Sequence, residues 1–304
     1  DGHMAMHNPK GRANYEPNSW GEEGGPRENP GRGVRSFAAE ETGPKTRLRP
    51  ESFEDHYSQA RQFYISQTPI EQKHIGDALV FELSKVERPD IRSRLVSHLR
   101  HIDEGLAKTV ANDLGLDLPK PAQAARPVND RLPPSDALSI LKNGPGSFAG
   151  RKLGILATEG ADAELFNALV AAVTKEKGAC EIVCPKIGGV TLSDGTKIPA
   201  KQKIDGGPSV LFDAVAILAS NEGAKLLAGD STAKDFINDA FAHCKFIGSS
   251  PEAALLFEKV GLAKDLDEAC IALASKADVG AFVKACRALR YWKREPAVDL
   301  DAKT

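Results

Sequence analysis

One turn in the second half of the chain carries the residue types that a covalent catalyst would need. Gly248-Ser249-Ser250-Pro251-Glu252 follows a short apolar segment that ends at Ile247. A tight passage from strand to helix resembles a nucleophile elbow, in which a neighbouring His activates a Ser or Cys. His243 is the one histidine in this half of the sequence, and it precedes the strand. It would lie at the opposite end of the strand, so we expect no active serine here.

Two further patterns suggest ligand binding but lack the required spacing. The loop Thr158-Glu159-Gly160-Ala161-Asp162 follows an apolar segment without the GxGxxG spacing of a dinucleotide site. We expect Glu159 and Asp162 to cap the following helix instead. His98 and His101 lie three residues apart on a predicted helix, where a metal site competes with a solvated polar face. We favour the polar face.

The cysteines favour a reducing compartment. Five are present, an odd number, and none forms a CxxC pair: Cys180, Cys184, Cys244, Cys270 and Cys286. We interpret them as buried thiols of a cytoplasmic protein.

Charge and hydropathy exclude several classes of partner. The 304 residues carry a formal net charge of −2, which gives no bulk attraction to nucleic acid or to an anionic membrane. The sequence contains no run of 18 apolar residues that could span a bilayer. Four arginines without interleaved aromatic residues predict a solvated helix face or a surface that docks on a partner chain, not a nucleic-acid platform: Arg88, Arg92, Arg94 and Arg100.

These residues are distributed over four stretches and a short tail. Residues 1–50 lack apolar periodicity, and anchors such as Tyr15, Trp20 and Phe37 favour an irregular arm that wraps another body. Residues 51–118 predict four short helices with a thin core. Residues 119–148 form a Pro-rich linker that should be extended. Residues 149–293 form the second domain, and residues 294–304 form a tail.

Start signals define the four helices of residues 51–118. Ser52 is a plausible cap for a helix over 53–66. Thr68, Pro69 and Glu71 form a capping-box pattern at the start of the second helix. Pro89 opens the third helix, and Asp103 caps the fourth.

Residues 149–293 alternate apolar strands with amphipathic helices. The repeated strand–helix order predicts a doubly wound parallel sheet and an α/β fold class. A hairpin turn is expected at 193–196. The predicted strands are 152–158, 179–186, 213–220 and 245–249, and the predicted helices are 161–177, 231–243, 251–260 and 278–290.

Several segments resemble monofunctional haem catalases. Asn14-Tyr15-Glu16-Pro17-Asn18-Ser19-Trp20 resembles the segment that follows the haem barrel in that family. Asp55-His56-Tyr57-Ser58-Gln59-Ala60-Arg61 and Phe81-Glu82-Leu83-Ser84-Lys85-Val86 resemble its helical region. The linker and α/β domain then resemble the flavodoxin-like appendage of large-subunit catalases. The resemblance implies that residues 1–50 wrap neighbouring subunits of a homotetramer. The start at Asp1-Gly2-His3-Met4 fits either a cloning scar or a piece of a longer chain.

The resemblance also indicates which functional residues to seek. The family places its distal His and Asn upstream of this chain and its proximal Tyr in an RxxxY motif. Arg287 to Tyr291 has that spacing, but Trp292-Lys293 follows where the family has x-Asp-Thr, so we interpret the match as coincidence. We therefore assign no catalytic, cofactor-binding or metal-binding residue. We expect no cofactor in this chain and a haem in the parent catalase.

The α/β domain also resembles the class I glutamine amidotransferase superfamily, which uses a Cys at its strand-to-helix elbow. Alignment on Pro251 places Gly248 at the Cys position, and Cys244 does not match. Two hypotheses follow. The chain serves as a structural and interaction module of a catalase, with the remainder of the subunit and neighbouring subunits as partners. Alternatively, the α/β domain has its own holdase-type chaperone activity or a residual hydrolase activity.

Overall fold

The computed structural model describes residues 20, 31, 38, 40 and 42–299. The chain divides into two units, Asp1–Glu54 and Asp55–Thr304. The predicted wrapping arm belongs to the first unit, and its anchors Tyr15 and Phe37 lie outside the described residues. The described part of the first unit ends in a 3-10 turn, η1 (Glu51–Glu54).

The first helix of the second unit begins later than predicted. Helix α1 covers Ser58–Ser66, not 53–66. Asp55 explains the difference, because its carboxylate accepts a hydrogen bond from Ser58 N at 3.0 Å and so satisfies a first-turn donor. Ser52 lies within η1 and caps no helix.

The other three helices of this region begin where their start signals predict. Thr68 and Glu71 form a reciprocal capping box before α2 (Pro69–Ser84). Pro89 is the first residue of α3 (Pro89–Leu99), and Asp103 caps α4 (Glu104–Asp113). Their apolar faces meet in one small core, made of Leu83, Val96, Leu99, Leu106, Ala107, Val110 and Ala111.

The linker is extended through its prolines and then forms two short turns that the sequence did not predict. These are η2 (Asp136–Leu138) and α5 (Ile140–Asn143). Ser139 lies between them, is buried, and caps α5 through its side chain.

The α/β domain contains a six-stranded parallel sheet. Its strand order is β5-β2-β1-β6-β7-β8, and a separate antiparallel pair joins β3 and β4. Without β5, the rank order is 2-1-3-4-5, which is the flavodoxin-like order. The predicted fold class is therefore confirmed. The strands are β1 (Lys152–Ala157), β2 (Ala179–Cys184), β3 (Val190–Thr191), β4 (Lys197–Ile198), β5 (Gln202–Lys203), β6 (Ala214–Leu218), β7 (Ile247–Ser249) and β8 (Cys270–Ala272).

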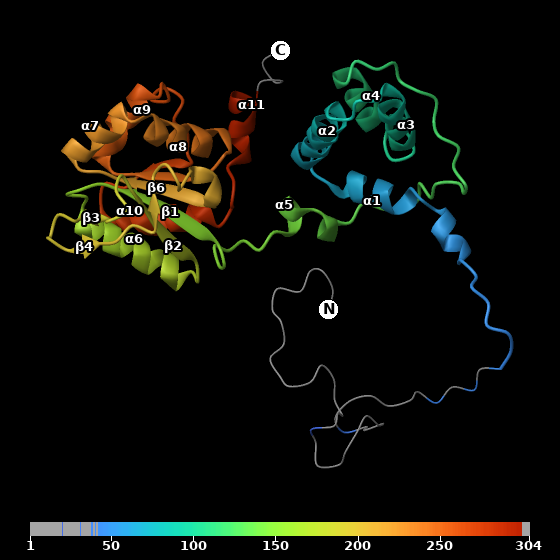
Figure 1. Ribbon diagram of the computed structural model, residues 1–304, viewed down its shortest axis with the longest axis horizontal. Coiled ribbons are helices and arrows are strands. Elements are labelled where there is room, and N and C mark those ends of the chain that lie inside the picture. The colour runs from blue at the N-terminus through green and yellow to red at the C-terminus, as the bar shows by residue number, and fades with distance from the viewer. Residues whose placement is uncertain (1–19, 21–30, 32–37, 39, 41, 300–304) are drawn as a thin grey trace. The chain divides into compact units, whose positions relative to one another are not determined.

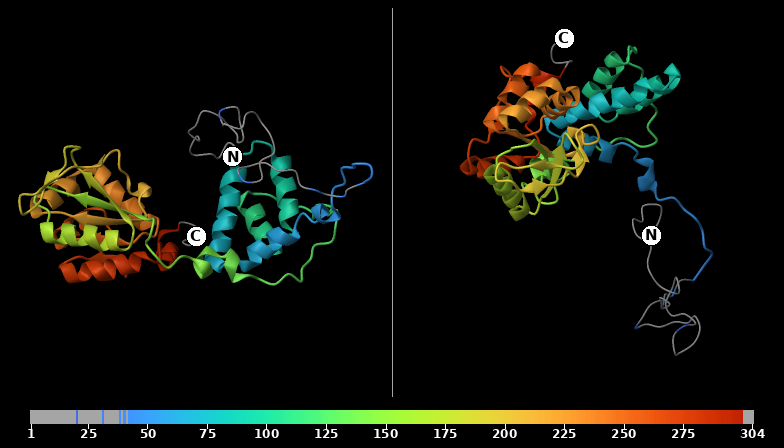
Figure 2. Two further views of the ribbon diagram at one scale, coloured as in Figure 1. Left: turned by 90° about the horizontal axis from the view of Figure 1, so that it is seen from below. Right: turned by 60° about the vertical axis from the view of Figure 1, so that its left-hand side comes forward.

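Helices cover both faces of the sheet (Figures 1 and 2). One face packs against α6 (Ala163–Lys175) and α10 (Lys276–Cys286). The other packs against α7 (Asn221–Gly229), α8 (Ser231–Ala242) and α9 (Ala254–Lys259).

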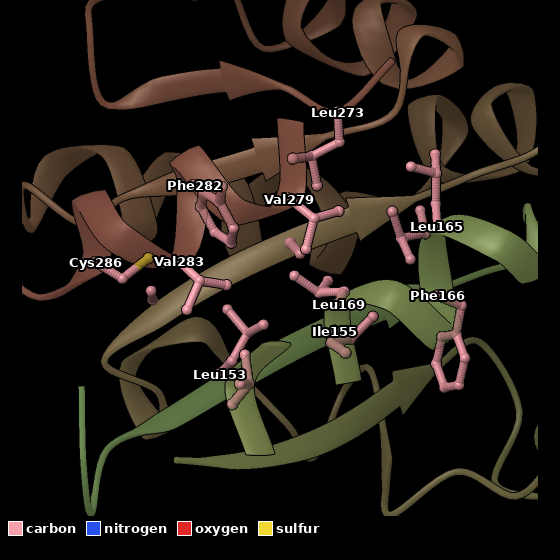
Figure 3. Packing of buried hydrophobic residues seen from close by; sticks show 14 of the residues in the cluster. Leu153, Ile155, Leu165, Phe166, Leu169, Leu273, Val279, Phe282, Val283 and Cys286 are labelled. Carbon is pink, nitrogen blue, oxygen red and sulfur yellow. The ribbon is translucent and has the colours of Figure 1, made fainter. Parts of the chain in front are cut away.

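Two apolar clusters fill the space between the sheet and its helices. Leu153 and Ile155 of β1 belong to the first cluster, together with Phe282 of α10 (Figure 3). Leu156, the next residue of β1, belongs to the second. This alternation follows the two-residue repeat of a strand, and it explains why a strand buried on both faces is apolar at nearly every position.

Several elements of this domain differ from the prediction. β5, β8 and α7 were not predicted, and the helix predicted at 251–260 is divided into η4 (Pro251–Ala253) and α9. Asp230 caps α8 by accepting a hydrogen bond from Ala233 N. The chain after α10 contains η5 (Trp292–Arg294), which crosses the predicted boundary between domain and tail, and α11 (Glu295–Val298). Within residues 42–299 and the four isolated positions, no helix is both long and apolar enough to cross a bilayer.

Candidate functional site

Open parallel sheets bind ligands at the carboxyl ends of neighbouring strands whose connections leave toward opposite faces. In this sheet, those strands are β1 and β6, because α6 follows β1 onto one face and α7 follows β6 onto the other. This edge is therefore where the fold would hold a ligand.

The loops after β1 and β6 are fastened to each other. Ser220 Oγ donates to Glu159 O at 2.6 Å, and Ser220 N donates to Thr158 Oγ1 at 3.1 Å. Helix α7 also lies so close to the residue after β1 that a Cβ on Gly223 would come within 1.9 Å of Thr158 Oγ1. These contacts hold the two loops together at the edge where related folds bind ligands.

The strand-to-helix turn after β7 has its serine hydroxyl engaged in the same way. Ser250 is 3 % exposed, and its Oγ accepts from Ala219 N at 3.1 Å and donates to Ala219 O at 3.2 Å. Its φ of −64° is ordinary, so the strained geometry of a nucleophile elbow is absent at this residue. His243 lies at the C-cap of α8, before β7 begins. Ser250 therefore joins the ends of β6 and β7, and His243 lies at the other end of the strand.

Gly248, the position expected to match an elbow cysteine, has little space for a side chain. A Cβ there would lie 2.9 Å from Leu273 Cδ1 and 3.1 Å from Phe282 Cζ. A cysteine at this position would therefore require the core beside β7 and β8 to move.

The two acidic residues of the loop after β1 have different roles. Asp162 caps α6, as predicted, by accepting from Leu165 N at 2.8 Å. Glu159 does not cap this helix. Its carboxylate accepts from Thr191 N at 2.8 Å and so fixes the β3–β4 hairpin beside the loop.

The Arg287–Tyr291 pair does not fit a haem-ligand role. A tyrosinate ligand needs an arginine close enough to lower the pKa of the phenol. Arg287 instead forms a two-armed ion pair with Glu176, and Tyr291 OH donates to Glu268 at 2.9 Å. Burial and the Glu268 carboxylate raise the pKa of Tyr291. We derive no iron chemistry from these residues.

His98 and His101 contact two other segments of the same chain through separate hydrogen bonds. His98 Nδ1 shares a hydrogen bond with Tyr57 OH at 2.7 Å, and His101 Nε2 with Ala122 O at 2.6 Å. The His101 ring also stacks on Tyr57, with 4.5 Å between ring centroids. Among the residues that the structure describes, no group of three or more His, Cys, Asp or Glu side chains could hold a metal ion.

The predicted basic face also has contacts within the helical region. Arg92 donates to Val86 O, and Arg100 pairs with Glu104 and donates to Pro119 O. Arg88 and Arg94 both pair with Asp90 and are largely exposed. Arg88 and Arg94 are therefore solvated, as predicted. Arg92 and Arg100 instead hold the backbone after α2 and at the start of the linker.

All five cysteines are free thiols, and three of them are buried: Cys184, Cys244 and Cys286. Burial raises the pKa of Cys180 to about 11, and it raises that of Cys184 to the same value with help from Glu159. High thiol pKa values disfavour the thiolate, which is the nucleophilic form.

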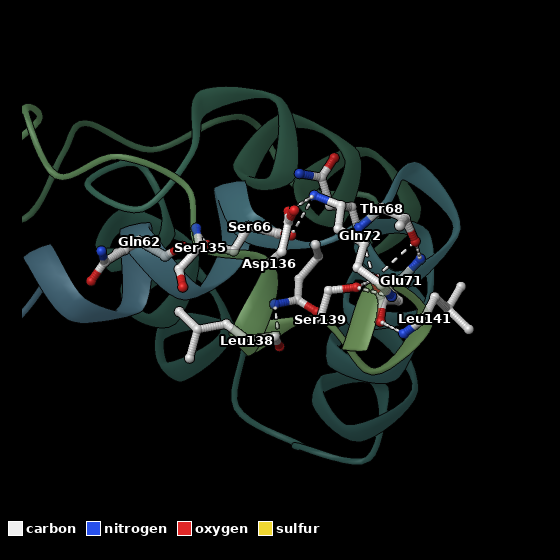
Figure 4. A network of polar contacts seen from close by, with 12 residues as sticks. Gln62, Ser66, Thr68, Glu71, Gln72, Ser135, Asp136, Leu138, Ser139 and Leu141 are labelled. Carbon is white, nitrogen blue, oxygen red and sulfur yellow. Dashed lines mark hydrogen bonds and ion pairs between the residues drawn. The ribbon is translucent and has the colours of Figure 1, made fainter. Parts of the chain in front are cut away.

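A network of polar contacts joins the linker to α1 and α2 (Figure 4). Glu71 Oε2 accepts from Ser139 Oγ at 2.7 Å, and Glu71 Oε1 accepts from Leu141 N at 3.1 Å. The same carboxylate completes the capping box with Thr68. Burial alone would raise the pKa of Glu71, but these hydrogen bonds outweigh burial and lower it to about 2.

Side chains of α1 extend the network along the linker. Ser58 Oγ accepts from Asn129 N at 2.7 Å, and Ser66 Oγ accepts from Ser135 N at 2.9 Å. Gln62 Nε2 donates to Pro133 O at 3.0 Å. The sequence predicted the capping box but not these contacts, because the linker partners lie about 70 residues away along the chain.

Comparison with known proteins agrees with this architecture. The family model described as catalase-related immune-responsive matches residues 50–114, and the model of the C-terminal domain found in long catalases matches residues 149–296. Catalase C of Rhizobium meliloti is 59 % identical over 301 residues, covering 99 % of this chain and 42 % of that protein. Catalase HPII of Pseudomonas putida is 37 % identical over 297 residues, covering 95 % of this chain and 41 % of that protein.

A fungal relative extends the comparison. Catalase-1 of Neurospora crassa is 30 % identical over 266 residues, covering 85 % of this chain and 35 % of that protein. The chain thus spans about two fifths of the length of these curated relatives. It belongs to the family of long catalases, in which it corresponds to the C-terminal part of a large-subunit catalase.

Proposed function

We propose that this chain is the stabilising and interaction module of a cytoplasmic large-subunit catalase. The whole enzyme would convert hydrogen peroxide to water and oxygen with a haem bound elsewhere in the subunit. The module would have no peroxide chemistry of its own. Its partners would be the remainder of its own subunit and neighbouring subunits of a homotetramer.

The observation that carries this proposal is that polar side chains make hydrogen bonds between segments of the chain that are distant in sequence. Ser220 and Ser250 join strand ends at the edge where related folds hold a ligand. Glu71 fixes the linker to α2. Groups suited to chemistry are thus engaged in holding the chain in one conformation.

Exposed aromatic side chains on the helical region support docking on the rest of the subunit. Phe63 of α1 is 46 % exposed, and Phe81 of α2 is 62 % exposed. The core beneath them is small. A thin helical layer of this kind gains stability when a larger body covers its outer face.

Peroxide turnover by the chain itself gives the first test. The purified chain is mixed with haemin, and the Soret spectrum and oxygen release from hydrogen peroxide are recorded. We expect no specific Soret shift and no oxygen. A specific haem spectrum with peroxide turnover would overturn the proposal that this chain has no peroxide chemistry of its own.

The stabilising role needs a test in the whole catalase that contains this region. Glu71→Gln should leave kcat unchanged but lower the temperature at which activity is lost. Glu82→Gln, on an exposed position of the same helix, is the matched control and should change neither value. Equal heat resistance of Glu71→Gln and wild type would contradict a stabilising role for the linker anchor.

The alternative activities of the α/β domain can be tested separately. The hydrolase version requires a free nucleophile, whereas Ser250 Oγ is buried and hydrogen-bonded to Ala219. If replacing Ser249 and Ser250 with alanine left any measured hydrolysis unchanged, that version would fail. The holdase version predicts that the chain suppresses aggregation of a heated client protein.

A further inference from the structure

A pocket of about 680 Å³ lies at the amino end of the sheet, opposite the carboxyl edge. Arg151 immediately precedes β1, and Asp213 immediately precedes β6. The segment after α10 forms another wall, which contains Arg287, Arg290 and Trp292. The volume is within the range of small-molecule sites.

Positive charge lines this pocket. Its lining contains four cationic residues and one carboxylate, namely Lys142, Arg151, Arg287 and Arg290, with Asp213. Ion pairs offset three of the cations: Arg287 pairs with Glu176, Lys142 with Asp136, and Arg151 with Asp213. Arg290 has no carboxylate within 4.0 Å among the residues that the structure describes.

Arg290 is held in place by backbone atoms. Its NH1 donates to Asp213 O at 2.9 Å and to Leu289 O at 2.8 Å. Burial lowers the pKa of the Arg290 guanidinium and Arg151 lowers it further, while Asp213 opposes them. Arg290 is therefore a partly buried cation whose charge is only partly offset by Asp213. A bound anion would supply the missing negative charge.

The backbone beside Arg290 is strained. Leu289 has a φ of +67°, in the left-handed region that a leucine adopts at a cost of about 1–2 kcal/mol. This conformation lets Arg290 N bond to Ala288 O at 2.8 Å and Tyr291 N bond to Cys244 O at 2.7 Å. The chain therefore turns at Leu289, and this turn places the Arg290 guanidinium at the pocket.

We propose that this pocket binds a phosphoryl group. Two guanidinium nitrogens of Arg290, Nε and NH2, make none of the described hydrogen bonds, and a planar guanidinium can hold two phosphate oxygens at once. Arg151 adds a second cation. Trp292 gives an apolar ring in the same lining, against which the organic part of a phosphate monoester can lie. Free phosphate and a monoester such as a nucleotide share this group, and the titrations below distinguish them.

The test uses the full chain with Trp20→Phe, so that Trp292 is the remaining tryptophan. Sodium phosphate and AMP are titrated separately at low ionic strength, and Trp292 fluorescence and calorimetric heat are measured. We expect saturable binding that weakens as salt is added. Arg290→Gln should weaken it at least about 10-fold, because it removes a charge-assisted hydrogen-bond donor. Arg290→Lys should recover part of the affinity.

Arg88→Gln is the matched control, because it removes an arginine from an exposed face of α3. It should bind as wild type does. If Arg290→Gln fails to fold, as judged by its thermal melting curve, Arg151→Gln provides the same test through the second cation. Equal affinity for phosphate and AMP would indicate free phosphate, and tighter AMP binding a monoester. Absence of saturable binding, or unchanged affinity in the folded Arg290 or Arg151 variant, would overturn the proposal.

Discussion

The α/β domain and the helical region with its linker are stabilised by different means. In the α/β domain, two large apolar clusters lie between the sheet and its helices. In the helical region one small cluster is present, and the linker beside it is held by hydrogen bonds to Glu71, Ser66 and Ser58. Apolar burial has little directional preference, whereas each hydrogen bond depends on one donor and one acceptor.

This difference predicts how each region responds to mutation. A core tolerates side chains of similar volume, and it loses stability in proportion to the volume removed. A polar tie is lost when one atom changes, even if the volume is preserved. Substitutions in the two regions should therefore have different effects on stability.

The largest effect is expected in the core of the α/β domain. Phe282 is fully buried, and Phe282→Ala should lower the free energy of unfolding by about 3–5 kcal/mol. Urea unfolding followed by Trp292 fluorescence, in the Trp20→Phe background, measures the loss. Phe282→Leu keeps most of the volume and should lose much less. Equal losses for the two variants would contradict the expected tolerance of the core.

A change of one atom at Glu71 should have the next largest effect. Glu71→Gln keeps the shape of the side chain but removes its charge, and should cost about 1.5–3 kcal/mol. The amide of Leu141 should lose protection in hydrogen exchange, because it donates to Glu71 Oε1. Glu82→Gln on the same helix should cost less than about 0.5 kcal/mol, since its pair with Lys85 is exposed. Unchanged Leu141 protection in Glu71→Gln would show that the anchor contributes nothing.

Acid should weaken the same anchor. The pKa of Glu71 is lowered from 4.5 to about 2, so its stabilisation is complete above pH 4.5 and is lost as the pH falls toward 2. The stability difference between wild type and Glu71→Gln should therefore shrink between about pH 5 and pH 2. Melting temperatures of both proteins across this range give the measurement. A difference that stays constant down to pH 2 would exclude Glu71 as its source.

The smallest effect concerns the carboxyl edge of the sheet. Ser250→Ala removes the hydroxyl that bonds to Ala219 and should cost about 1 kcal/mol. Ser249→Ala serves as the control at the neighbouring residue, because no side-chain hydrogen bond is described for it, and should cost less. Chemical denaturation of the two variants compares them directly. A larger loss for Ser249→Ala would reverse the roles assigned to the two serines.

Local signals in the sequence were sufficient for most helices. Thr68 and Asp103 mark helix starts that the structure confirms, because a cap acts on donors within the next three residues. Pro89 marks a third start, because its fixed φ suits the first position of a helix. The start of α1 was misplaced because Ser52 forms part of a separate 3-10 turn, while Asp55 accepts the hydrogen bond of Ser58 N, the first residue of α1. The short strands β5 and β8 were missed, since two or three residues show no periodicity and their pairing depends on distant strands.

The roles of individual side chains could be predicted only where their partners are close in the sequence. Asp162 was assigned correctly because Leu165 N lies three residues away. Glu159 was misassigned because its partner Thr191 lies 32 residues away. The ties of Ser250 to Ala219 and of Glu71 to Ser139 are also non-local, so no spacing rule reveals them.

The anchored linker bears on where the protein can be cut into independent pieces. Composition suggests a division near residue 118, where the Pro-rich segment begins. A fragment that ended there would leave the Ser58 and Ser66 hydroxyls and the Glu71 carboxylate without their linker partners. Separation between Gly144 and Ser147 keeps every one of those contacts on the helical side. In gene fusions and truncation series, the linker through Asn143 therefore belongs with the helices that precede it.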